Sequence, residues 1–156
     1  MNKRSQAVMD ALRRVVQAAR QSSAQCERLS GLTAAQLLIL KSIQVHPGLS
    51  INDLAAVTLT HQASVSEVVG RLESRGLLVR TRSQEDARRR ELQLTDSGLN
   101  ALKLPVETVQ ETLIKAMDRL PPELLEHLAD GLERLIQEAG LSHEPPAMLF
   151  EDGKAP

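Results

Sequence analysis

Apolar side chains recur at helical spacing through most of the chain, so the hydrophobic pattern predicts a mainly helical protein. Residues 5–29 are expected to form an amphipathic helix, because apolar residues recur at helical spacing at Val8, Leu12, Val15, Val16 and Ala19. A second helix is expected to begin at Thr33, because Thr33 and Gln36 have the spacing of a capping box. It carries apolar residues on more than one side and ends at Pro47-Gly48. We therefore expect it to be central and buried.

Two helices joined by a short turn are expected next. Ser50 can cap a short helix over residues 51–57, and a further helix is expected over residues 62–74. One side of this further helix is apolar, and its other face offers mainly short polar side chains. The apolar side consists of Val65, Val68, Val69 and Leu72. Such a pair is typical of a helix-turn-helix.

The pattern changes again after Gly76, where a glycine can end the helix. Residues 77–82 are a candidate strand, and residues 91–94 alternate polar and apolar as a half-buried strand does. The loop between them is polar and charged, so the two strands are expected to form a hairpin. A helix-turn-helix followed directly by a hairpin is a winged helix. We assign this lobe to residues 32–98.

The remaining apolar stripes predict further helices after the hairpin. From Thr95 the pattern is helical again, and Pro105 should kink this helix near residues 101–104. Pro121-Pro122 suits the first turn of a last helix. Residues 141–156 are expected to form a tail.

The apolar stripes of the outer helices exceed what one small winged helix can bury. A second copy of the chain would cover them, so residues 1–31 and 99–140 are assigned to a helical dimerisation region. A self-contained helical bundle is the alternative. The expected fold class is mainly α (α+β): a winged helix-turn-helix with a two-stranded β wing, flanked by N- and C-terminal dimerisation helices.

Composition excludes several classes of protein. The chain has 156 residues, with one Phe and no Trp or Tyr, so aromatic platforms for single-stranded nucleic acid are effectively excluded. Its single cysteine excludes an internal disulfide framework and fits a reducing compartment. No apolar run approaches the roughly 18 residues of a membrane span, and the N-terminus lacks an apolar signal core. We expect a cytoplasmic protein without a membrane partner.

Charge is segregated along the chain although the net charge is only −1. Residues 71–98 contain seven arginines, whereas most of the charged residues within 107–138 are acidic. A solvated face is one explanation of such a run. An arginine-tipped hairpin after a helix also suits a surface that meets a polyanion.

Enzymatic chemistry is not expected. The sequence has no nucleophile–base–acid pattern, no Gly-rich phosphate loop and no pair of catalytic carboxylates that stands out. Its four histidines do not have metal-ligand spacing, so we expect neither a metal site nor a cofactor. They are His46, His61, His127 and His143.

The hairpin and the helix before it resemble a known family. Residues 86–98, DARRRELQLTDSG, resemble the wing signature of the MarR family of bacterial transcription regulators, roughly D-x-R-x-x-x-L-x-L-T-x-x-G. Residues 65–77 resemble the family's recognition helix and the turn after it, and residues 32–36 the start of its second helix. The match covers roughly residues 30–100 by motif. Beyond them, only the order and length of the helices match.

This resemblance implies a homodimer in which the terminal helices of both chains interlock. It implies a winged-helix lobe on each side, which reads a near-palindromic operator in double-stranded DNA, most often as a repressor. It also implies regulation by a small anionic or phenolic ligand, or by cysteine oxidation. A winged helix that docks another protein instead of DNA is the rival interpretation.

On the recognition helix, Gln62, Ser64 and Ser66 lie in the first turns, where major-groove readers contact bases. Each serine can instead be a helix cap, and Ser64 and Glu67 fit a capping box. Arg71 can reach phosphate or pair with Glu67 four residues earlier. Glu67 departs from the family, whose members often carry a basic or polar residue there.

In the wing, Arg88 falls on the family's wing arginine, and a planar guanidinium suits the minor groove or its phosphates. Asp86 falls on the family's acidic position. It can fix the hairpin by pairing with a wing arginine, or be an ordinary turn residue. Arg89 and Arg90 add positive charge, at the DNA or on the outer side of the strand. The expected DNA-binding residues are Gln62, Ser64, Ser66, Arg71, Asp86, Arg88, Arg89 and Arg90.

The resemblance implies two candidate regulatory features. A ligand pocket would lie between the dimer helices and the DNA-binding lobe, with an aliphatic lining. Its candidate neighbours are Leu12, Val16, Leu37, Leu40 and Val109. Cys26 is a candidate redox sensor, but it lies late in the first helix, away from where the family's peroxide sensors carry theirs. We favour a structural or inert thiol.

Overall fold

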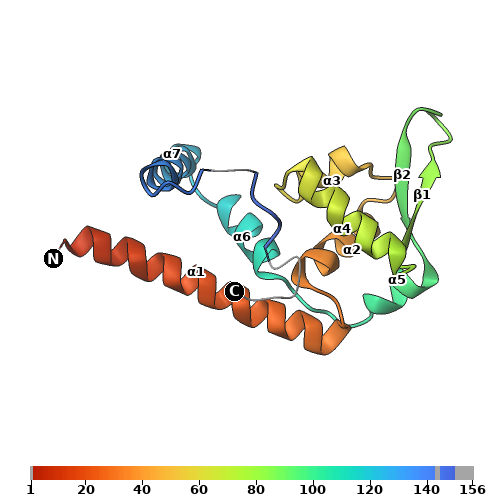
Figure 1. Cartoon of the computed structure of the whole chain (residues 1–156), viewed down its shortest axis with the longest axis horizontal. Helices are drawn as coiled ribbons and strands as arrows, with labels where there is room; N and C mark the ends of the chain where they lie inside the picture. Colours follow the sequence, from red (N-terminus) through yellow and green to blue (C-terminus); the bar gives the residue numbers. More distant parts are fainter. Residues whose placement is uncertain (1, 143–144, 150–156) are drawn as a thin grey trace.

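The computed structural model describes residues 2–142 and 145–149 and confirms the expected winged helix (Figure 1). A long helix runs along one edge, a lobe with a projecting hairpin lies at one end, and two later helices follow. The elements in chain order are α1 (Lys3–Ser30), α2 (Ala34–Val45), α3 (Ile51–Val57), α4 (Gln62–Ser74), β1 (Leu78–Arg82), β2 (Arg90–Leu94), α5 (Asp96–Ala101), α6 (Val109–Met117) and α7 (Pro122–Glu138).

Local side-chain caps define where the lobe's first helices begin. Thr33 and Gln36 form the predicted capping box at α2, each side chain bonding the other's backbone N–H. Ser50 caps α3 as expected, and Asp53 completes a second capping box there. Helix α1 ends at Gly31, whose φ of 70° is left-handed and suits glycine. These short-range bonds explain why the helix starts were readable from the sequence.

Helix α2 is the centre of the core. Leu37, Ile39 and Leu40 are at most 1% exposed, and α2 contacts α1, α3, α4 and β2. The predicted apolar side of α4 faces inward and is fully buried. The α2–α3 connection is joined to the wing, because the Leu92 N–H donates to the Leu49 carbonyl at 2.9 Å. The lobe therefore holds α4 and the wing in a fixed relation.

The prediction of one kinked helix from Thr95 onward is wrong. Helix α5 ends at Ala101, residues 102–108 are not helical, and α6 begins at Val109. Pro105 has no N–H to donate, and its ring disfavours helical backbone at the preceding residue. Thr108 then starts a new helix through a capping box with Glu111. The proline breaks the helix because a strong helix start lies just beyond it.

The outer helices leave apolar faces uncovered. No side chain of α7 is buried, and Figure 1 shows α7 and the first half of α1 lying away from the lobe. Exposed apolar side chains on these two helices are Val8, Met9, Val15, Val16, Leu124, Leu128, Leu132, Leu135 and Ile136. No helix among the described residues is long and apolar enough to cross a membrane.

Part of the expected tail is packed. Residues 143–144 and 150–156 of the 141–156 tail lie outside the described residues. Within the described part, Met148 is only 4% exposed and belongs to the core cluster. The Ser64 hydroxyl of α4 donates to the Pro146 carbonyl at 3.1 Å. Residues 145–149 are therefore docked on the lobe.

Candidate nucleic-acid interface

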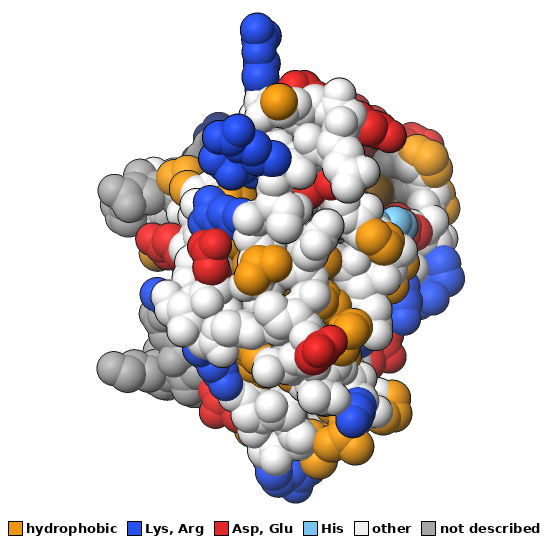
Figure 2. Space-filling view, turned by 90° about the vertical axis from the view of Figure 1, so that its right-hand side faces the viewer, with side chains coloured by type: hydrophobic (Ala, Val, Ile, Leu, Met, Phe, Trp, Pro, Cys, Tyr) orange, Lys and Arg blue, Asp and Glu red, His pale blue; other side chains and the backbone are white. Residues whose placement is uncertain are grey.

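A cleft of about 610 Å³ separates the wing from the first turns of α3 and α4. Its lining residues are Ser50, Ile51, Asn52, Asp53, Gln62, Arg80, Asp86, Arg88, Arg89, Arg90 and Leu92. Figure 2 shows basic side chains gathered toward the wing end of this side of the molecule, above a mostly uncharged surface. The cleft brings together Gln62 and the three wing arginines that the sequence singled out.

The first turns of α4 present a polar edge to this cleft. Gln62 is exposed and Ser66 is partly exposed, whereas Ser64 is only 7% exposed beneath the docked segment. The alternative in which Ser64 caps the helix is wrong, since α4 already begins at Gln62, with His61 as its N-cap. His61 makes no side-chain bond to the helix amides. Glu67 is exposed on the outer face.

The wing arranges arginines face to face. In the hairpin register Arg82 pairs with Arg90, and Leu78 and Leu92 lie on the same face nearer the lobe. Like charges directly opposite each other on a two-stranded ribbon are destabilising. Among the described residues, neither Arg88 nor Arg90 has an ion pair or hydrogen bond through its guanidinium. Such a concentration of unneutralised charge suits contact with an anionic partner.

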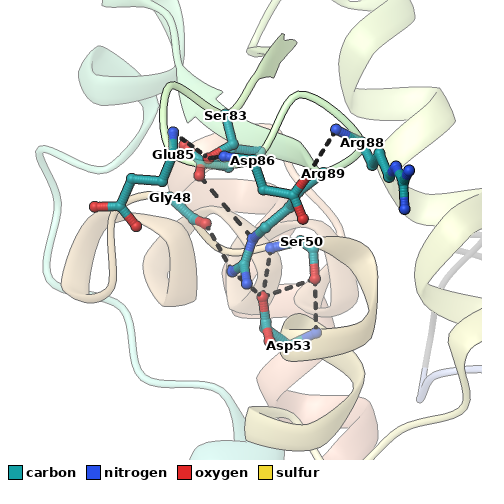
Figure 3. A network of polar contacts seen from close by, with 9 residues as sticks. Gly48, Ser50, Asp53, Ser83, Glu85, Asp86, Arg88 and Arg89 are labelled. Atoms are coloured by element: carbon teal, nitrogen blue, oxygen red, sulfur yellow. Dashed lines mark hydrogen bonds and ion pairs between the residues drawn. The ribbon is translucent and has the colours of Figure 1, made fainter.

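Arg89 behaves differently, because it clamps the wing to α3 (Figure 3). Its Nη2 atom lies 2.6 Å from Asp53 Oδ2 and 3.3 Å from the Gly48 carbonyl oxygen. The Ser50 hydroxyl and backbone N–H also donate to Asp53 Oδ2, at 2.7 and 2.8 Å. We name this group, Gly48, Ser50, Asp53 and Arg89, the wing clamp. Sequence reasoning missed Asp53, because its partner lies 36 residues away.

The clamp is complete at neutral pH. Hydrogen bonds from Ser50, first from its hydroxyl and then from its backbone, hold the pKa of Asp53 below its usual value, and Arg89 adds to the effect. A carboxyl with a lowered pKa in the folded state stabilises that state above its unfolded pKa. This contribution is lost only as the pH falls through the lowered pKa. The Asp53 carboxylate therefore remains charged and available to Arg89 at neutral pH.

Asp86 acts as a turn residue. Its Oδ1 accepts a hydrogen bond from the backbone N–H of Arg88 at 2.9 Å, and its carbonyl accepts from the N–H of Arg89. The possible pairing with a wing arginine is replaced by this backbone bond. Figure 3 shows the Arg88 side chain pointing away from the wing clamp. The turn thus directs Arg88 outward.

The other arginines of residues 71–98 have different roles. Arg75 donates to the Gln36 amide oxygen at 3.0 Å and to the Gly31 carbonyl, and Arg80 pairs with Glu73 at 3.1 Å. Both tie elements of the lobe together. Arg71 lies exposed on α4, in the same surface hollow as Glu67. Residues 71–98 therefore contain two kinds of arginine. Some bond to other elements of the lobe, whereas those at the tip of the wing face outward.

Cys26 is buried in α1, with 0% exposure. Burial raises the pKa of its thiol, partly offset by a hydrogen bond with Ser22. The reactive thiolate is therefore disfavoured. We expect Cys26 to react with a thiol reagent far more slowly in the native protein than in denaturant, and peroxide to leave DNA binding unchanged. Peroxide sensitivity that disappears in Cys26→Ser would contradict this expectation.

The expected neighbours of a ligand pocket are not gathered in one place. Leu37 and Leu40 are core side chains, whereas Val16 is 48% exposed on the open face of α1. A cleft of about 210 Å³ does lie between α2 and α6, at the junction of the lobe and the later helices. Lys41, in an ion pair of 2.6 Å with Glu111, and Lys115 line it.

Comparison with known proteins is consistent with this geometry. Residues 30–89 match the model of the MarR family. The HTH-type transcriptional repressor MdtR of Bacillus subtilis (strain 168) is 35% identical over 68 residues, 44% of this chain and 44% of the relative. The transcriptional regulator HosA of Escherichia coli is 29% identical over 103 residues, 64% of this chain and 76% of the relative. The chain thus spans less than half of the length of MdtR.

Solved structures share the fold. The S. aureus MepR–DNA complex matches with a TM-score of 0.55 and 20% identity, over 88% of this chain and 96% of that one. The transcriptional regulator SlyA matches with a TM-score of 0.55 and 22% identity, over 85% of this chain and 93% of the SlyA chain. These likenesses confirm the mainly helical winged-helix fold with its two-stranded wing.

Proposed function

We propose that this chain, whose residues 30–89 match the model of the MarR family, is a transcriptional regulator that binds specific sites in double-stranded DNA as a homodimer. The proposal makes it a binding protein of the cytoplasm, not an enzyme. MdtR, which resembles it, is named a repressor, and repression is the sign of regulation that we propose.

One observation carries the DNA-binding proposal: unneutralised arginines stand across one cleft from the exposed Gln62 in the first turn of α4. A helix with exposed N-terminal residues suits the major groove, and an adjacent hairpin with arginines suits the backbone or the minor groove. The wing clamp fixes the distance between these two parts. Gln62 and Ser66 are the proposed base contacts, with Arg71, Arg88 and Arg90 at phosphates. Arg89 and Asp86 hold the wing.

The dimer proposal rests on α7. Its leucines form one stripe that is 41–51% exposed, and an isolated helix of 17 residues is marginal in water. A second copy would cover this stripe and the open half of α1. A palindromic site then follows, since a two-fold dimer presents two recognition helices about one helical turn of DNA apart, roughly 34–36 Å.

Charge on the α7 stripe should separate the two chains. We expect Leu128→Lys to weaken the dimer by roughly 10²–10⁴-fold, because two buried leucines are lost, each worth about 1.5–3 kcal/mol. Glu126→Lys, on the opposite face of α7, makes a similar lysine without touching the stripe and should leave the dimer intact. Sedimentation of both variants over a concentration series measures this. A monomeric wild-type chain would contradict the proposal.

Selection of DNA fragments by the purified protein tests the function. We expect enrichment of a near-palindromic site whose half-sites lie about one helical turn apart. Binding to random duplex should be weaker and steeply salt-dependent. Salt-independent binding, or none at all, would overturn the proposal and favour a winged helix that docks another protein.

A small anionic or phenolic effector is part of the proposed regulation. The cleft between α2 and α6 supports this, because it joins the proposed dimerisation helices to the lobe and is lined by two lysines. An anion bound there would replace Glu111 as the partner of Lys41 and Glu107 as the partner of Lys115. A ligand that changes the α2–α6 contact would move the lobe relative to the dimer axis. The two recognition helices would then no longer match the spacing of the half-sites.

A further inference from the structure

Residues 145–149 return from the end of α7 to the beginning of the recognition helix. Met148 is inserted into the core cluster with 4% exposure. The Ser64 hydroxyl donates to the Pro146 carbonyl at 3.1 Å, a contact across 82 positions of sequence. An apolar anchor and a hydrogen bond to α4 itself therefore hold this segment in place.

The docked segment completes a junction at the N-terminal end of α4. A cavity of about 270 Å³ lies there, lined by the α3–α4 turn, by α6 and by residues 146–149. Gln110 of α6 donates to the Thr58 carbonyl at 2.7 Å and to the Thr60 hydroxyl at 3.3 Å. The segment therefore packs between the turn that precedes the recognition helix and a helix that leads to the dimerisation region.

This position conflicts with insertion of α4 into DNA. The major groove is about 12 Å wide, and a helix with its side chains is about 10–12 Å across, so one helix fills the groove. Helix-turn-helix proteins approach the bases with the N-terminal residues of the recognition helix. A second segment of chain beside this end makes the inserted body wider than the groove. The docked segment and DNA therefore compete for the same end of α4.

We propose that residues 145–149 are an autoinhibitory segment, which covers Ser64 on one side of the first turn of the recognition helix in the resting protein, leaves Gln62 exposed, and is released when DNA binds. This inference rests on the proposed function. It also explains why Ser64 is buried in this structure although its place in the first turn of α4 suits a contact with DNA. The serine holds the segment while it is buried, and it becomes available to DNA once the segment leaves. Release is opposed mainly by the burial of Met148.

Two changes should release the segment. Met148→Asp places a charge in the apolar anchor, and a chain that ends at Ser142 lacks the segment altogether. We expect both to bind the selected operator roughly 10²-fold more tightly than the wild type, the factor expected when burial of one apolar side chain in each chain of the dimer no longer opposes binding. Met148→Leu keeps the anchor and should bind as the wild type does. Fluorescence anisotropy with labelled operator measures the affinities.

A second measurement follows the segment itself. The methyl NMR signal of Met148, a side chain that is only 4% exposed in the free protein, should move to the position of a solvent-exposed methionine in the DNA complex. Equal or weaker operator binding by both the Met148→Asp and the shortened chain would overturn the inference, and so would a Met148 methyl signal that stays unchanged on DNA. In those cases the proposed function still stands, because the wild type binds. If no form of the protein binds duplex DNA, the proposed function fails and the inference with it.

Discussion

Gly98→Ala is expected to destabilise the fold by at least about 3 kcal/mol, which is a large part of the stability of an ordinary domain. A Cβ atom on Gly98 would stand 2.0 Å from the Leu77 carbonyl oxygen and 3.1 Å from its carbon. Both are backbone atoms, so no side-chain rotation relieves the clash. The same carbonyl accepts a hydrogen bond from the Thr95 N–H at 3.2 Å. Moving α5 or the backbone at Leu77 to relieve the clash would therefore break this hydrogen bond, which joins α5 to the wing.

A matched glycine separates this clash from the general effect of the substitution. Gly70 lies inside α4, and nothing stands within 4 Å of the position its Cβ would take. Gly70→Ala should raise stability by about 0.5–1 kcal/mol, as is usual for glycine in a helix. Urea unfolding of both variants at one fixed protein concentration gives the comparison. A Gly98→Ala protein as stable as the wild type would show that α5 sits differently against Leu77.

Removing the outward-facing wing arginines is expected to lower affinity for any duplex by about 10²–10⁴-fold per variant in the dimer. Each variant removes two charge-assisted contacts, each worth about 1.5–3 kcal/mol. Arg88→Ala and Arg90→Ala should each also reduce the slope of log affinity against log salt by about 1.8, which corresponds to one phosphate per wing. Anisotropy titrations on random duplex over a range of salt concentrations measure both quantities.

The wing clamp provides the matched control. The double variant Asp53→Asn/Arg89→Gln removes one negative and one positive charge, which lie 2.6 Å apart in the wild type. We expect the salt slope to stay unchanged while affinity falls, because the wing is no longer held beside α3. A slope that falls in the double variant but not in Arg88→Ala or Arg90→Ala would show that Arg89 is the arginine at the phosphates.

Local features of the sequence were sufficient to predict most of the elements. The capping boxes at Thr33 and Ser50 act over three residues, so their spacing is visible in the sequence and recurs in the structure. The alternation in residues 91–94 likewise gave the second strand of the wing. Pro105 was recognised as an interruption. The chain breaks there instead of kinking, and the capping box of Thr108 with Glu111 begins a new helix beyond the proline.

The features that sequence reasoning missed are long-range. Asp53 pairs with Arg89 only because the fold of the lobe places α3 beneath the wing. No local sequence pattern in either segment predicts this ion pair. Ser64 was predicted to face DNA from its place in the first turn of α4. Its burial depends on a segment 82 residues away. Tertiary contacts decide which arginines are neutralised and which side chains are covered.

The uncovered α7 has a consequence for how the regulator depends on its own abundance. No side chain of α7 is fully buried within its own chain, so in the proposed dimer this helix gains its stability from association, and its folding and the pairing of chains form a single equilibrium. Below the dissociation constant of the proposed dimer, the amount of DNA-competent species rises with the square of the chain concentration. A modest change in synthesis or proteolysis would then become a steeper change in operator occupancy. The cell could thus set the threshold of the switch by expression level alone.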